Sequence, residues 1–291
     1  MKLFIAFTSI ILCFVLHSFT YPTTHAEESI NLEDAIKKGL VKINVKGLGG
    51  HSGNCLEAKI QNISSKNISL IIKPGTLFKP NDTSMQDIVV VRGLLFALEK
   101  NNVKTQKLMG FCCKSSNRCP SVGMDFKLVK VSNAKLIEMA TYLSKAKCNE
   151  NAMQSAIWSI SNGHSVSEIY DDDAQKVKAL RAEVCRLTGQ KDNWYSTNTN
   201  RVINERGYIQ SEPVLVNGLI KVNLEKPAAI FQGIYKENGD VVEAPEKLFD
   251  VPGRGELTFK FSLKVKGWEK GKYYVKVNLS DKEILRQEFT I

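Results

Sequence analysis

After its first 16 residues the chain has no apolar run long enough to cross a membrane as a helix. It also lacks the GxSxG turn of many hydrolases, and the glycine-rich segment 47–53 is not followed by the helix that a phosphate-binding loop requires. Histidine is scarce: His17 and His25 lie near the N-terminus, and His51 and His164 stand alone in the sequence. A Cys–His pair using His164 has no supporting motif. The sequence therefore predicts that the protein is not an enzyme.

Signals for nucleic acid, metal and cofactor binding are also missing. The net charge is +10, but the 40 basic residues are spread along the chain and no nucleic-acid-binding module is recognisable. Three cysteines within residues 110–120 lack the second ligand pair of a zinc ribbon. The acidic run 171–173 lacks the spaced oxygen ligands of a calcium loop and is better interpreted as charge at a helix N-terminus. We expect no cofactor, no metal and no nucleic-acid partner.

The N-terminal segment 1–26 has the pattern of a secretory signal peptide. Lys2 precedes an apolar run at 3–16, and the small residues Thr24 and Ala26 precede a cleavage site after Ala26. The run is too short to span a bilayer. The sequence predicts a secreted or cell-surface protein whose mature chain has no transmembrane segment.

Six of the seven cysteines lie beyond this segment, at Cys55, Cys112, Cys113, Cys119, Cys148 and Cys185. An even number in an exported chain favours disulfides, and sequence alone cannot choose among the possible pairings. Cys113 with Cys119, and Cys148 with Cys185, are two pairs that could close. No cysteine follows residue 190, which indicates a domain boundary near that point.

The hydrophobic pattern predicts a mostly β fold with a three-helix subdomain. Alternating segments from 41 to 110, separated by turn residues, indicate a β-sandwich or barrel in a cysteine-containing domain at 27–190. Residues 191–216 are polar and predict a linker. Residues 217–291 return to strands and predict an immunoglobulin-like β-sandwich.

Three amphipathic helices are expected within the first domain. Ser132 is a possible cap for the first of them, and Gly163 and Gly189 are natural stops for the other two. Helical spacing relates Leu136, Met139, Ala140 and Leu143, then Met153, Ile157 and Ile160, and finally Val177, Leu180, Val184 and Leu187.

The second helix contains MQSAIW, residues 153–158, in which the polar Gln154 lies one turn before Trp158. This stretch resembles the Thr-Gln-x-Ala-x-Trp motif of thioester domains in bacterial surface proteins, with Met153 in place of Thr. The resemblance implies a bond between the Gln154 side chain and an upstream cysteine sulfur, and a β-domain joined to a helical subdomain. The sulfur could come from Cys112, Cys113 or Cys55. The alternative is that Gln154 is a partly buried structural residue.

The C-terminal segment has a second resemblance. Tyr235, Gly239, Gly271, Tyr273 and Lys276 match in type the sorting domain of proteins exported by the type IX secretion system. That resemblance implies contact with secretion machinery. A generic adhesive β-sandwich is the alternative.

The sequence as a whole predicts an exported, non-enzymatic surface or extracellular binding protein with a C-terminal sorting or attachment module and an unknown partner. The alternative is a covalent adhesin that uses a Cys–Gln thioester. A secreted hydrolase has the least support.

Overall fold

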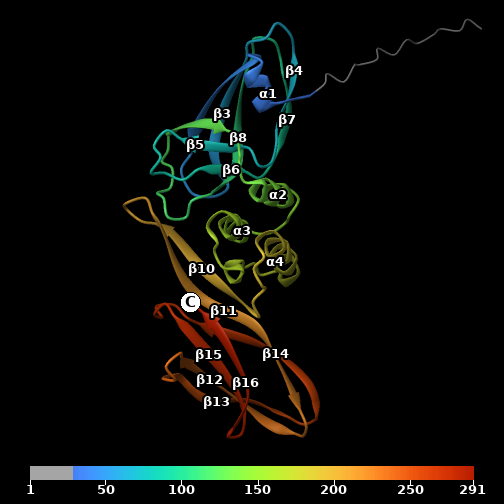
Figure 1. The fold of residues 1–291 in the computed structure, drawn as a ribbon, viewed down its shortest axis with the longest axis vertical. Coiled ribbons are helices and arrows are strands. Elements are labelled where there is room, and N and C mark those ends of the chain that lie inside the picture. Colours follow the sequence, from blue (N-terminus) through green and yellow to red (C-terminus); the bar gives the residue numbers. More distant parts are fainter. Residues whose placement is uncertain (1–28) are drawn as a thin grey trace, which may run out of the picture.

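A computed structural model describes residues 29–291, and the segment predicted to be a signal peptide lies outside this range. The described chain is elongated (Figure 1). A β-domain, a group of helices and a second β-domain follow one another along its long axis, and the C-terminus lies where the helices meet the second β-domain. The prediction of a mostly β fold with a helical subdomain is confirmed.

The first β-domain is a closed barrel with a small sheet beside it. The barrel order is β2 (Val41–Gly47), β3 (Asn54–Asn62), β8 (Val103–Cys112), β6 (Ile88–Val90), β5 (Leu77–Pro80) and β9 (Asp125–Val129). The small sheet contains β1 (Ile30–Asn31), β4 (Ile68–Ile72) and β7 (Leu94–Leu98), next to the short helix α1 (Leu32–Lys37). Alternate residues of β3, such as Ala58 and Ile60, are fully buried, as period-2 patterning requires.

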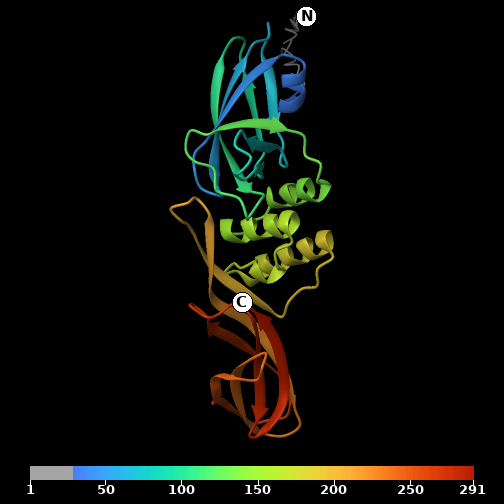
Figure 2. The same cartoon turned by 60° about the vertical axis from the view of Figure 1, so that its left-hand side comes forward.

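Three helices lie between the barrel and the second β-domain (Figure 2). They are α2 (Ala134–Leu143), α3 (Glu150–Asn162) and α4 (Ala174–Thr188), with the short 3-10 helix η1 (Val166–Glu168) between the last two. The side chains of the predicted apolar stripes, except Val177, pack in one core with barrel residues such as Val89 and Phe111. Short helices of this kind are stable because such a surface covers their apolar faces.

The helix ends agree with the sequence except at one cap. Asn133, not Ser132, caps α2, because its side chain accepts a hydrogen bond from the backbone of Leu136. Gly163 and Gly189 end α3 and α4 in the left-handed conformation, with φ of 73° and 79°.

The second β-domain is a two-sheet sandwich. One sheet has the order β10 (Tyr195–Ile203), β11 (Ile209–Leu224) and β14 (Gly255–Lys264). The other has the order β13 (Val241–Val251), β12 (Ala228–Lys236), β15 (Lys272–Leu279) and β16 (Lys282–Thr290). Its core is apolar and aromatic, and includes Phe261 and Phe289.

The segment 191–216, predicted to be a linker, differs from that prediction. Most of it belongs to the β10–β11 hairpin, and the predicted boundary at residue 217 falls inside β11. The inward positions of β10 include Thr197 and Thr199, which are buried although they are polar. A strand that buries threonines lacks the apolar alternation on which the prediction relied.

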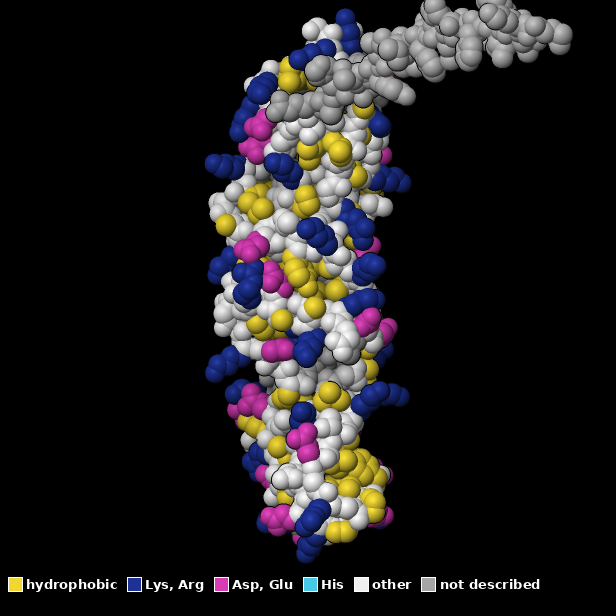
Figure 3. All heavy atoms as spheres, turned by 90° about the vertical axis from the view of Figure 1, so that its right-hand side faces the viewer, with side chains coloured by type: hydrophobic (Ala, Val, Ile, Leu, Met, Phe, Trp, Pro, Cys, Tyr) yellow, Lys and Arg dark blue, Asp and Glu magenta, His cyan; other side chains and the backbone are white. Residues whose placement is uncertain are grey.

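No helix in residues 29–291 is long and apolar enough to cross a membrane. Lys and Arg side chains are scattered along the face seen in Figure 3, interspersed with Asp and Glu.

Candidate functional site

The C-terminal end of β8 lies between two different neighbours. On one side it pairs with β6, in a register that places Cys112 opposite Ile88. On the other side the pairing with β3 has ended, and the glycine-rich loop 47–53 takes its place. Gly110 N–H donates to the carbonyl of Gly53 at 2.8 Å. Cys112 N–H donates to the carbonyl of His51 at 3.0 Å. The edge of β8 at Cys112 is therefore only partly covered by main chain.

Gln154 completes this edge. Its side chain is fully buried, and its Nε2 donates to the Cys112 carbonyl at 2.8 Å. The Cys112 N–H donates to Gln154 Oε1 at 3.2 Å, in addition to its bond with His51. The carboxamide thus pairs with both main-chain groups of one residue, much as a neighbouring strand would. The structure brings together Gln154 and Cys112, two of the residues singled out in the sequence.

Two sequence features place Gln154 there. Asn149 caps α3, because its side chain accepts a hydrogen bond from the backbone of Ala152 at 2.8 Å, and this fixes where the helix begins. The following turns pack on the barrel through Met153, Ala156 and Ile157, which are buried. Gln154 is therefore held at the junction between α3 and β8.

The thioester candidates Cys112 and Cys113 belong to different cores. Cys112 belongs to the core of the barrel together with Cys55, whereas Cys113 belongs to the core formed with the helices. Burial raises the pKa of the Cys55 thiol and that of the Cys113 thiol to about 12 each. Cys113 Sγ lies 3.7 Å from the carbonyl of Phe111.

The Cys112 thiol interacts with a fourth cysteine. Burial and the hydrogen bond to the Cys119 thiol raise the pKa of Cys112 well above its ordinary value. The same hydrogen bond lowers the pKa of Cys119, because it stabilises a thiolate there.

All six cysteines beyond residue 28 are free thiols in this structure. Cys119 contacts Cys112 rather than Cys113 as its thiol partner. Cys148 Sγ lies 3.8 Å from the carbonyl of Lys176, and Cys185 is partly exposed. The disulfide pairings remain a prediction.

The buried Trp158, one turn beyond Gln154, is the centre of an aromatic and cationic cluster. The ring of His51 is stacked on it with centroids 6.3 Å apart, and the ring of His164 is tilted against it at 5.4 Å. The guanidinium of Arg201 lies 5.1 Å from the Trp158 ring centre, within cation–π range. We call these four residues the Trp158 cluster.

Arg201 comes from β10, within the segment predicted to be a linker. Its Nη2 donates to Ser155 Oγ at 2.7 Å and its Nη1 donates to the carbonyl of Asn151 at 3.2 Å, which attaches β10 to α3. Burial lowers the pKa of Arg201, and burial together with the Arg201 charge lowers the pKa of His51.

The sequence interpretation missed a hydrogen-bonded chain on the outer side of the Trp158 cluster. Ser115 Oγ lies 2.8 Å from His164 Nε2, and His164 Nδ1 lies 3.0 Å from Glu168 Oε2. The only local signal was the four-residue spacing of His164 and Glu168, since Ser115 lies 49 residues before the histidine.

The acidic run 171–173 acts at helix N-termini. Asp173 accepts hydrogen bonds from the backbone of Gln175 and Lys176 at the start of α4, and Asp171 accepts one from the backbone of Asn149 at the start of α3. In residues 29–291 no group of three or more His, Cys, Asp or Glu side chains could hold a metal ion.

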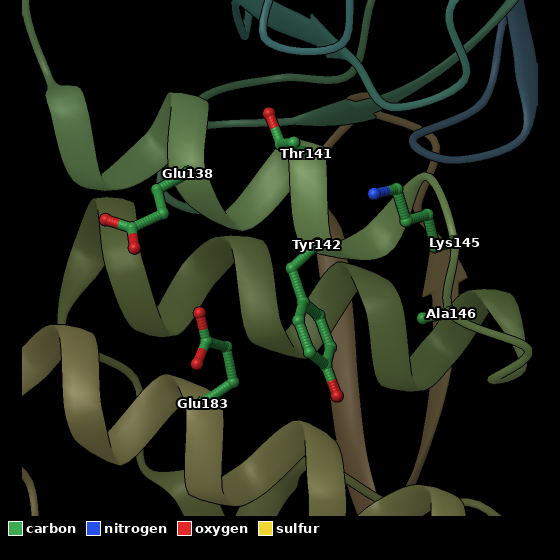
Figure 4. A pocket seen from close by; sticks show the side chains of 6 residues that line it. All are labelled: Glu138, Thr141, Tyr142, Lys145, Ala146 and Glu183. Atoms are coloured by element: carbon green, nitrogen blue, oxygen red, sulfur yellow. The ribbon is translucent and has the colours of Figure 1, made fainter.

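A separate hollow lies on the outer surface of α2 and α4 (Figure 4). It is lined by Glu138, Thr141, Tyr142, Lys145, Ala146 and Glu183. Both carboxylates already pair with Arg186, so they are not available for a ligand without breaking those ion pairs. This surface contains neither Gln154 nor any cysteine.

No family model and no curated protein sequence matches the chain. Among solved structures the chain is similar to a transglutaminase from red sea bream, with a TM-score of 0.21, 8% identity and coverage of 93% of this chain and 34% of that one. It is also similar to DesR, a β-glucosidase from Streptomyces venezuelae in complex with D-glucose, with a TM-score of 0.19, 7% identity and coverage of 87% and 48%. The chain thus spans about a third and about half of the lengths of these two proteins.

Proposed function

We propose that the protein is an exported surface adhesion protein that attaches to its partner covalently, through a thioester between Cys112 and Gln154. The pairing of the buried Gln154 carboxamide with both main-chain groups of Cys112 carries this proposal. It holds the side-chain carboxamide against the main chain of the residue proposed to supply the sulfur, which supports a reaction between the two residues.

The reaction needs no external oxidant or cofactor. The Cys112 sulfur attacks the carboxamide carbon of Gln154, and the Cys112 thiol proton passes to the departing nitrogen. A sulfur–carbon bond forms, the carbon–nitrogen bond breaks, and the nitrogen leaves as ammonia with the transferred proton. The sulfur must rotate away from Cys119 to reach the carbon.

Burial supports the survival of such a bond. Gln154 and Cys112 are both fully buried, so water has little access to the acyl carbon. A surface amine or hydroxyl of the partner that reaches this carbon would form an amide or ester with Gln154. The carbon–sulfur bond would break, and the nucleophile's proton would restore the Cys112 thiol.

Cys112 is a better sulfur donor than Cys113 or Cys55. It is the residue whose own main chain holds the carboxamide. Within residues 29–291, neither Cys113 nor Cys55 has a hydrogen bond to the Gln154 side chain.

Intact mass spectrometry of the purified mature protein tests the proposal. The thioester lowers the mass by about 17 Da through loss of ammonia, and methylamine then adds to the protein. The variants Gln154→Ala and Cys112→Ala should keep the full mass expected from their sequences. The matched variant Cys113→Ala should still lose ammonia.

A wild-type protein at its full mass, with six alkylatable thiols and no reaction with methylamine, would overturn the thioester. The protein would then be the non-covalent surface binding protein predicted from the sequence, and Gln154 would serve only to close the edge of β8. If Cys113→Ala, and not Cys112→Ala, abolishes the loss of ammonia, the thioester forms with Cys113 rather than with Cys112.

A sorting or attachment role is proposed for the second β-domain, on the resemblance of its last 75 residues to type IX sorting domains. The export test should remove residues 195–291, because a cut at 217 would divide β11 and leave the β10–β11 hairpin without β14 and the second sheet. Unchanged export of the shortened chain would reject the sorting role without affecting the thioester.

A further inference from the structure

We propose that Ser115, His164 and Glu168 form a nucleophilic serine site that takes short acyl groups from carboxylic esters. This activity is separate from the thioester, and it departs from the expectation of a non-enzymatic protein. A nucleophile, a base and a carboxylate that orients the base, joined in that order by hydrogen bonds, are the arrangement that activates a serine on many unrelated folds.

The distances fit this order of roles. Ser115 Oγ and His164 Nε2 are 2.8 Å apart, and His164 Nδ1 and Glu168 Oε2 are 3.0 Å apart. A neutral imidazole satisfies both contacts when Nδ1–H donates to Glu168 and Nε2 accepts the hydroxyl hydrogen of Ser115. Nε2 is then the base for the serine proton.

The three side chains come from elements that are fixed independently. Ser115 follows the end of β8, and its backbone N–H donates to Asn162 Oδ1 at 3.2 Å, which attaches it to the end of α3. The His164 ring packs against Trp158, and Glu168 ends η1. Arg201 Nη2 lies 3.8 Å from the Glu168 carboxylate.

The site is open to a substrate. Ser115 is partly exposed, its neighbour Ser116 is exposed, and the His164 and Glu168 side chains are 27% and 32% exposed. Because the surroundings are polar, a short acyl group suits this site better than a long apolar chain.

Two N–H donors near Ser115 are available to stabilise the negative charge that develops on the oxygen of the attacked carbonyl. The Ser116 N–H and the Asn162 Nδ2 group have no hydrogen-bond acceptor within residues 29–291. Preorganised N–H donors at this position are the usual means of stabilising a tetrahedral intermediate.

The step is a simple acyl exchange. The Ser115 oxygen bonds to the ester carbonyl carbon and its proton passes to His164 Nε2. The carbon–oxygen bond to the leaving alcohol breaks, and that alcohol takes the proton. Water then attacks the acyl-serine by the same route and restores the hydroxyl, with the carboxylic acid as product.

The experiment is labelling of the full mature protein with a fluorophosphonate, which reacts with activated serines, followed by peptide mapping. Release of nitrophenolate from p-nitrophenyl acetate is the second measurement. We expect the label on Ser115, no label in Ser115→Ala, and about 100-fold slower labelling in His164→Gln. Glu168→Gln should slow it by about 10-fold, because it disturbs the orientation of the base.

Ser121→Ala is the matched control, since that exposed serine lies in the same segment after β8 and has no histidine partner, and it should keep the label. Equal melting temperatures of the His164→Gln and wild-type proteins exclude loss of fold as the reason for slower labelling. Absence of label on Ser115 in the wild type, or labelling of His164→Gln at the wild-type rate, would overturn the proposal. The Cys112→Ala variant should keep the label, so failure here and failure of the thioester are distinguishable.

Discussion

The two β-domains of this chain differ in what they bury. The barrel and its helices enclose polar side chains, including Gln86, Asp87 and Gln154, and four of their cysteines are buried. The sandwich beyond β10 buries apolar and aromatic residues, and residues 200–291 contain no polar or charged residue in the buried class. Buried polar groups are costly unless they are paired. Their concentration in the first region agrees with the place that we propose for the function.

The largest effect of the difference between the two regions is expected at Gln154. Replacement by Ala leaves the buried Cys112 carbonyl without a donor and opens a cavity, so Gln154→Ala should lower the free energy of unfolding by about 3 kcal/mol. Gln210→Ala, at an exposed position of β11, is the matched control and should stay close to wild type. Urea denaturation measures both. Equal midpoints for the two variants would contradict the role given to Gln154.

The next largest effect is expected where the two regions join. Arg181 of α4 donates to the carbonyls of Tyr195 at 2.9 Å and Asn193 at 2.7 Å and pairs with Asp192, so one buried side chain holds the helices to the start of β10. Arg181→Ala should cost about 2 kcal/mol, because it leaves those carbonyls unpaired. It should also separate the unfolding of the two regions in calorimetry.

Arg186→Ala is the control for that experiment. Arg186 lies on the same helix, but its ion pairs with Glu138 and Glu183 are exposed, and its loss should leave the melting temperature unchanged. A single, unshifted transition in Arg181→Ala would mean that other contacts join the regions.

The smallest expected effect is a pH dependence that arises in the first region. Burial and Arg201 lower the pKa of His51 in the folded state, so the unfolded chain binds the His51 proton more tightly. Stability therefore rises with pH across this range, and it falls as pH drops from about 7 through the unfolded pKa of about 6.5. His51→Gln should reduce this slope in denaturation series between pH 7 and pH 5. An identical slope in the variant would show that other groups are responsible.

Local patterns predicted much of the fold. The apolar stripes of α2, α3 and α4 are buried as their spacing indicated, and the period-2 segments of β2, β3 and β4 are strands. These features depend on neighbours a few residues apart. The helix α1, strand β9 and the β10–β11 hairpin were missed. The hairpin escaped because its inward positions include threonines, and its Arg201 is partnered by α3 rather than by its own strand.

The candidate site was also predicted only in part from the sequence. Gln154 was found because a helix motif marks it, but the choice of Cys112 over Cys113 and Cys55 needed the pairing at the edge of β8. The meeting of Ser115 with His164 depends on how the end of β8 lies against the end of α3, across 49 residues. No pattern within either segment encodes that approach.

The position of the C-terminus has a mechanical consequence. Thr290 N–H donates to the Tyr195 hydroxyl at 2.9 Å, so the start of β10 in one sheet lies close to the end of β16 in the other. A force applied between the barrel and Ile291 would enter the sandwich at two adjacent points and peel its terminal strands apart, while the distal loops carried little load. Under tension the second β-domain would hang to one side of the line of force, and the barrel and helices would transmit the load.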